Sequence, residues 1–169
     1  MRNIETWLDE YGVSHHHPIN KAIHWICVPL IMIALIGLLW ILPVPDAWRS
    51  YSPFLNWGVC AVLLMLIYDF VLTWRLALGM TLISLIMIGI VYGASQLPIP
   101  LGGLGAAIFV LAWAGQFIGH GIEGRKPSFL RDLQFLLIGP LWLLAFMYRA
   151  GGLPIDSRRA VTDRPAERL

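Results

Sequence analysis

Four long apolar runs constrain the fold of this chain more than any other feature of its sequence. They cover residues 23–42, 54–72, 76–97 and 104–120. A helix needs about 20 predominantly apolar residues to cross the hydrocarbon core of a bilayer, so each run is long enough, or nearly so, to span a membrane. A fifth run, residues 133–148, is shorter, and its Gly139-Pro140 pair predicts a break. We expect it to form a kinked span, a re-entrant hairpin or an interfacial helix.

The composition supports a membrane protein. Hydrophobic residues make up 58% of the chain and charged residues only 13%, whereas soluble domains contain about 25% charged residues. These values argue against a soluble domain, a disordered chain, a coiled coil and a disulfide scaffold. A net charge of +2 without a basic stripe predicts no nucleic-acid partner. Cys27 and Cys60 lie inside apolar runs without a CxxC pair, which predicts two buried apolar side chains.

We therefore predict an all-α fold: a polytopic integral membrane bundle of four to five hydrophobic helices. It forms one domain over residues 1–150, with an amphipathic N-terminal segment at residues 1–22 and a polar tail at residues 151–169. If the N-terminus is cytoplasmic, most loop cations fall on that side, as the positive-inside rule requires. These cations are Arg2, Lys21, Arg75, Arg125, Lys126 and Arg131. The expected location is a bacterial inner membrane, or the endoplasmic reticulum of a eukaryote.

The basic tail adds a condition to this topology. Its arginines remain in the cytoplasm only if the fifth run does not fully cross the membrane, and we expect that arrangement. Gly89 and Gly93 form a Gly-x-x-x-Gly pair in the third span. Such pairs usually mark helix packing, and they leave the oligomeric state open.

All histidines fall at one predicted membrane face. They are His15, His16, His17, His24 and His120. Pro18 is well placed as the first residue of a helix, which leaves His15 to His17 in the preceding loop and His24 about two turns into the first span. His120 ends the fourth span. Because odd spans begin and even spans end at the cytoplasmic face, the first and fourth helices can bring their imidazoles together there.

Helical spacing makes this convergence more specific. Asn20 and His24 are four residues apart and share a face, as do Gln116, His120 and Glu123. Gly115 and Gly119 form a Gly-x-x-x-Gly pair on the fourth span, and small residues at that spacing allow close helix packing.

Imidazoles with a carboxylate suit a divalent ion such as iron, zinc or manganese. Ligation by His15, His24, His120 and Glu123 would leave room for substrate or dioxygen. Two histidines and a carboxylate with open positions is a known arrangement in non-haem iron enzymes. The residues leave open which metal binds, and whether His16 or His17 replaces His15.

Simpler interpretations also remain open. Interfacial histidines often serve as wet anchors, as caps or as partners of lipid phosphate. Glu123 has Arg125 and Lys126 as nearby ion-pair partners. Asp69 lies near the inner end of the second span, where ionisable residues are rare and often functional. It would either orient a histidine N–H beside the metal or pair with Arg75.

Two stretches carry a resemblance to a known family. The first is Y-x-x-x-H-x-x-P-x-N-K-x-x-H-x-x-x-x-P, from Tyr11 to Pro29, and the second is AWAGQFIGHGIEGRKPSF, from Ala112 to Phe129, followed by LLIGPLWLL. They resemble the Mpo-type membrane proteins of fungi and bacteria. The resemblance implies an iron(II)-dependent dioxygenase that removes one carbon from a 2-hydroxy fatty acid in α-oxidation.

The resemblance also implies roles for particular residues. The metal ligands would be His15, His24, His120 and Glu123. We expect Glu123, Asn20, Lys21 and Asp69 as catalytic residues, and Asp69 is included for its position in the second span and not for the resemblance. The partners would be Fe(II), dioxygen, a 2-hydroxy long-chain fatty acid and membrane lipid. The carboxylate and hydroxyl of such an acid can chelate one ion, Lys21 or Arg125 would steer the carboxylate, and the alkyl chain would lie in the bilayer or between helices.

Two other functional classes compete with this reading. One is a zinc-dependent membrane hydrolase acting on a lipid through the same histidines. The other is a non-enzymatic membrane metal-binding protein. A transporter is disfavoured because the middles of the first, third and fourth runs are almost wholly apolar.

Overall fold

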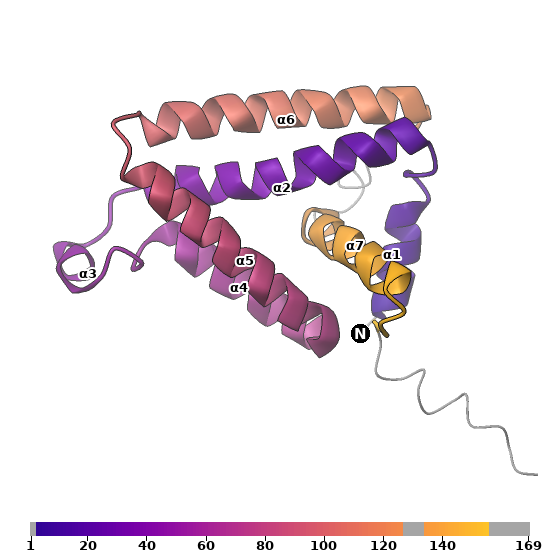
Figure 1. The fold of residues 1–169 in the computed structure, drawn as a ribbon, viewed down its shortest axis with the longest axis horizontal. Coiled ribbons are helices and arrows are strands. Elements are labelled where there is room, and N and C mark those ends of the chain that lie inside the picture. The colour runs from indigo at the N-terminus through magenta and orange to yellow at the C-terminus, as the bar shows by residue number, and fades with distance from the viewer. Residues whose placement is uncertain (1–2, 127–133, 156–169) are drawn as a thin grey trace, which may run out of the picture.

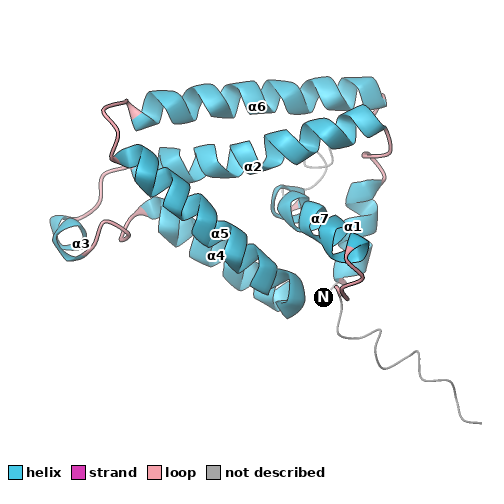
Figure 2. Ribbon diagram, viewed as in Figure 1, coloured by secondary structure: helices cyan, strands magenta, loops and turns pink. Residues whose placement is uncertain are grey.

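The structure is a computed structural model, and it describes residues 3–126 and 134–155. The described residues form helices joined by short loops, and no strand occurs among them (Figures 1 and 2). The helices are α1 (Ile4–Gly12), α2 (Pro18–Trp40), α3 (Asp46–Tyr51), α4 (Trp57–Leu72), α5 (Trp74–Ser95), α6 (Leu101–Glu123) and α7 (Phe135–Ala150). The predicted all-α fold is therefore confirmed.

The predicted apolar runs correspond to the five longest helices. α2, α5 and α6 are long and apolar enough to cross a membrane, and α4 and α7 are shorter apolar helices. Their lipid-compatible faces carry exposed side chains such as Ile26, Leu64 and Leu111, which are 63%, 68% and 71% exposed. Such faces are expected where lipid replaces water as the solvent. The chain is thus a helical membrane protein.

Two details of the fold differ from expectation. The fifth run forms one helix that contains Pro140, so a re-entrant hairpin that turns at Gly139-Pro140 is not observed. Pro140 removes only one hydrogen bond near the start of α7, and this stretch packs so closely on α1 that a Cβ at Gly139 would lie 3.0 Å from the Tyr11 hydroxyl oxygen. The short helix α3 was not anticipated. The end of the predicted polar tail, residues 156–169, lies outside the described residues.

α2 forms the centre of the molecule. α6 runs back along it, α4 and α5 form a second pair that crosses it, and α1 and α7 pack together near its N-terminal end (Figure 1). Buried side chains of α1 and α7, including Leu8, Ile138 and Leu141, share one hydrophobic core with Leu76 and Met80 of α5. This packing fixes the loop between α1 and α2 relative to α2 itself.

Glycines make the close contact between α2 and α6. A Cβ at Gly115 would lie 2.8 Å from the Cys27 sulfur, and a Cβ at Gly119 would clash with the Asn20 Oδ1 atom. The Gly-x-x-x-Gly pair of Gly115 and Gly119 is therefore a packing motif between these helices. In the other Gly-x-x-x-Gly pair, a Cβ added at Gly89 or Gly93 would meet no atom within 4 Å.

Candidate metal centre

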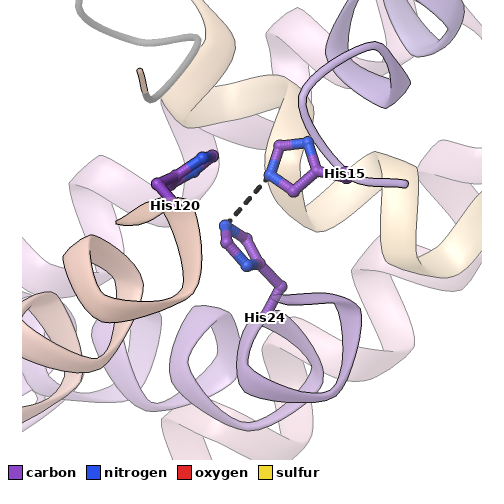
Figure 3. Close-up of side chains that lie close together, drawn as sticks. All are labelled: His15, His24 and His120. Atoms are coloured by element: carbon purple, nitrogen blue, oxygen red, sulfur yellow. Dashed lines mark hydrogen bonds between the residues drawn. The ribbon is translucent and has the colours of Figure 1, made fainter. Parts of the chain in front are cut away.

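Three histidines from separate parts of the chain meet in the interior. His15 comes from the loop between α1 and α2, His24 from α2, and His120 from the last turn of α6 (Figure 3). They are only 1%, 1% and 5% exposed. One ligand nitrogen from each ring lies within 4.8 Å of the other two. The predicted convergence of histidines is confirmed, and His15 rather than His16 or His17 joins the other two.

The start of α2 explains why His15 is free of the helix. Pro18 is the first helical residue, as predicted, and His17 is the N-cap, whose side chain accepts a hydrogen bond from the Ile19 N–H at 3.2 Å. His15 therefore lies in the loop before the helix, where its N–H donates to the Gly12 carbonyl at 3.0 Å, and its ring meets that of His24 in α2.

Hydrogen bonds to backbone carbonyls fix the tautomers of two rings. The Nδ1 atom of His15 lies 2.6 Å from the Tyr11 carbonyl oxygen, and Nδ1 of His24 lies 2.9 Å from that of Asn20. A carbonyl oxygen only accepts, so each Nδ1 carries the hydrogen. In the neutral ring, each Nε2 then holds a lone pair. These two Nε2 atoms lie 3.0 Å apart (dashed line in Figure 3).

Burial keeps His15 neutral. Its ring stacks on Tyr11, with centroids 4.2 Å apart and planes 10° apart, and lies 5.3 Å from the Trp142 ring. Loss of hydration, followed by the repulsion from His24, lowers the pKa of His15 to about 3. A proton is therefore a poor candidate to separate the two facing lone pairs.

His120 supplies the third nitrogen. Its Nδ1 atom is buried and has no hydrogen-bond partner among the described residues. An unsatisfied buried nitrogen costs about 1–3 kcal/mol, and a bound cation would remove this cost.

The spacing of the nitrogens fits a divalent transition metal. Metal–nitrogen bonds of about 2.1 Å meeting at a right angle place two nitrogens about 3.0 Å apart, which matches the separation of the His15 and His24 Nε2 atoms. Three neutral imidazoles suit iron, zinc or copper. Three protein ligands are typical of catalytic rather than structural sites.

Glu123 has a different place from the one expected of a ligand. Its Oε1 accepts the His16 N–H and its Oε2 accepts the His17 N–H, both at 2.8 Å, and Asn20 Nδ2 donates to Oε2 at 3.2 Å. The metal-binding group found among the described residues contains the three histidines and not Glu123. The carboxylate instead neutralises the N-terminal end of α2 and ties the loop that carries His15 to α6.

Asn20 takes part in the same hydrogen-bond network as Glu123. Its side chain is fully buried, and Nδ2 also donates to the Ser14 carbonyl at 3.0 Å. Its own carbonyl orients His24. Asn20 thus holds both ends of the loop without lining the cavity beside the histidines.

The other predicted site residues lie elsewhere. Lys21 is half-exposed on the first turn of α2 and does not line the cavity. Asp69 is buried in α4, but neither of its oxygens has a hydrogen-bond partner among the described residues. It therefore makes neither the predicted bond to a histidine nor the alternative bond to Arg75. Backbone carbonyls orient His15 and His24 in its place.

A small cavity of about 60 Å³ adjoins the three histidines. Its lining also includes Gln116 of α6, which the sequence places on the face of His120, and Trp113, which was expected only as an interfacial anchor. Both lie on the helical face of His120, at four and seven residues before it, so the same spacing could also have indicated Trp113.

We expect Glu123 to act through the loop. Glu123→Ala removes both acceptors of the His16 and His17 N–H groups and should lower the free energy of unfolding by about 1–2 kcal/mol, because the site is half-exposed. The affinity of the histidines for a divalent metal should fall about 10–100-fold. Glu123→Gln retains one acceptor oxygen and should lie between wild type and Glu123→Ala. Thermal unfolding and metal titration measure both effects.

Asp46→Ala, at an exposed acid of α3, is the control for these variants. Wild-type iron affinity in Glu123→Ala would contradict the positioning role of Glu123.

Comparison with known proteins identifies the family to which the chain belongs. No solved structure matches it. The chain is 26% identical over 159 residues to the 2-hydroxy-palmitic acid dioxygenase MPO1 of Saccharomyces cerevisiae, an alignment that covers 91% of this chain and 85% of the yeast protein. The family model described as 2-hydroxy-palmitic acid dioxygenase Mpo1-like matches residues 1–150. This match includes every helix from α1 to α7, and the chain therefore belongs to the Mpo1-like family.

Proposed function

We propose that this protein is an iron(II)-dependent dioxygenase that shortens 2-hydroxy long-chain fatty acids by one carbon. The observation that carries the proposal is the 3.0 Å separation of the His15 and His24 Nε2 atoms. With both Nδ1 hydrogens committed to carbonyls, two lone pairs face each other, and only a cation between them makes that contact favourable. The name of the yeast relative supports the choice of substrate.

In this proposal the metal supplies the redox chemistry, and the protein residues position the metal and exclude water. An iron(II) ion held by His15, His24 and His120 would supply the redox chemistry that activates dioxygen. Tyr11 and Trp142 cover His15 and help to exclude water from the site. The carbonyls of Tyr11 and Asn20 hold two rings in the ligating tautomer.

The surroundings suit the polar end of a fatty acid. His120 lines the cavity and also an open groove that contains Arg125 and Lys126. These cations would attract a carboxylate toward the histidines. The adjacent hydroxyl at C2 would then lie beside the same group of rings, where both oxygens can serve as ligands.

The proposed reaction balances without a further reductant. Cleavage of the C1–C2 bond of a 2-hydroxy acid by one dioxygen yields the acid shortened by one carbon, carbon dioxide and water. The substrate loses four electrons, and dioxygen accepts four. We therefore expect one dioxygen consumed for each carbon dioxide released.

Anaerobic purification with metal analysis, followed by an oxygen-electrode assay with 2-hydroxypalmitic acid, tests the proposal. The expected result is iron-dependent oxygen uptake with pentadecanoic acid as product and equal amounts of oxygen consumed and carbon dioxide formed. Stoichiometric zinc without oxygen uptake would contradict the proposal and favour a hydrolase.

A further inference from the structure

The cavity continues from the histidines along one face of α2. Val28, Ile31 and Met32 line it at four, seven and eight residues after His24, the spacing of a single helical face. All three side chains are apolar. At about 1.5 Å per residue, this stretch extends about 12 Å from His24 to Met32, close to the depth of one leaflet of a hydrocarbon core that is about 30 Å thick.

α6 provides the facing wall with the same change in polarity. Because α6 runs opposite to α2, the order His120, Gln116, Trp113 leads away from the histidines in the same direction. The polar groups are therefore concentrated at one end of the cavity. We call its other end, lined by Val28, Ile31, Met32 and Trp113, the apolar arm.

The cavity is accessible from the side. Leu136 of α7 lines it and is nevertheless 42% exposed. α6 and α7 both pack on α2 and have little direct contact with each other. Phe117 of α6 is half exposed and packs near Trp113, with ring centroids 5.9 Å apart. In a membrane, the exposed apolar side chains of Leu136 and Phe117 would lie against lipid.

We propose that the apolar arm binds the proximal part of the substrate's acyl chain, and that the distal part extends into lipid between α6 and α7. The acid would lie like a lipid of the same leaflet, with its head group at the histidines. This inference rests on the proposed function and adds its determinant of specificity. The distal part of the acyl chain lies in lipid both when the acid is free in the bilayer and when it is bound. A longer chain should therefore not change the binding affinity once the apolar arm is filled.

Kinetics with acids of different length test the inference. For the iron-loaded protein in lipid nanodiscs, kcat/KM for 2-hydroxypalmitic and 2-hydroxytetracosanoic acids should agree within about threefold, and 2-hydroxybutyric acid should be much poorer. A sharp maximum at one chain length would overturn the inference, because it would require a closed end to the site.

A steric variant isolates the apolar arm. Ile31 lines it but belongs to neither hydrophobic core cluster, so Ile31→Trp should fill the arm with little effect on folding. We expect kcat/KM for 2-hydroxypalmitic acid to fall at least about tenfold, and that for 2-hydroxybutyric acid to change less than about twofold. Ile26→Trp, at an exposed position of the same helix, is the matched control. Equal loss for both acids, or no loss for either, would overturn the inference.

Photo-crosslinking gives a readout that does not need turnover. A fatty acid with a diazirine on a proximal chain carbon should label Met32 or Trp113 in the wild-type protein, and Ile31→Trp should abolish this labelling. Labelling confined to outer lipid-facing residues would overturn the inference. Labelling of the apolar arm in a protein that consumes no oxygen would retain the binding site and reject the proposed reaction.

Discussion

Purified His24→Ala and His120→Ala proteins are expected to contain almost no iron. Each variant removes one of three nitrogens that lie within 4.8 Å of one another. Loss of groups that merely orient a ligand already costs about 10–100-fold in metal affinity, so loss of a ligand should cost at least that much. Elemental analysis after anaerobic loading measures the effect, and oxygen uptake should disappear with the iron.

His16→Ala is the matched control for these variants. His16 is exposed and lies outside the three-histidine group, and its link to Glu123 uses the backbone N–H, which alanine retains. It should bind iron like wild type. Added Fe(II) should also raise the melting temperature of wild type and His16→Ala, but not that of the other two variants. Full iron in either His24→Ala or His120→Ala would mean that the ligand set is wrong.

Gly119→Ala should disrupt the site without touching a ligand. The new Cβ would clash with the Asn20 Oδ1 atom, and Asn20 holds both Ser14 and Glu123. Overpacking of this kind costs about 1–3 kcal/mol. The displacement of α6 from α2 would also separate His120 from His24, so iron affinity should fall with stability.

Gly121→Ala provides a control of opposite sign. A Cβ at Gly121 meets no atom within 4 Å, and alanine in a helix is more favourable than glycine by about 0.5–1 kcal/mol. Thermal unfolding of the metal-free proteins in one detergent should therefore rank Gly121→Ala at or above wild type and Gly119→Ala below it. Equal stability of the two variants would show that α2 and α6 are not packed as described.

The sequence predicted the convergence of the histidines because two simple rules determine it. Alternation of span direction places the start of the first span and the end of the fourth at one face, and helical periodicity orients His24 and His120. Pro18 predicted the start of α2 for a similarly local reason, since its ring suits the first turn of a helix.

The sequence was least informative where backbone or tertiary contacts decide the outcome. The ligand role of Glu123 stays a prediction, whereas the bonds of its carboxylate to the His16 and His17 N–H groups are new, because backbone N–H groups occur in every sequence and no motif reveals such contacts. Pro140 left a re-entrant hairpin open for the fifth run, but the contact between α7 and α1 supports one helix.

The use of a loop residue together with the end of α6 has a consequence for biosynthesis. Four helices, α2 to α5, lie between His15 and the helix α6 that carries His120, so a chain emerging from the ribosome holds only two of the three nitrogens until α6 has been synthesised. On the proposed function, a metal ion would be captured by all three histidines only after α6 has been inserted, so a protein of this design would acquire its metal at the membrane rather than during early translation.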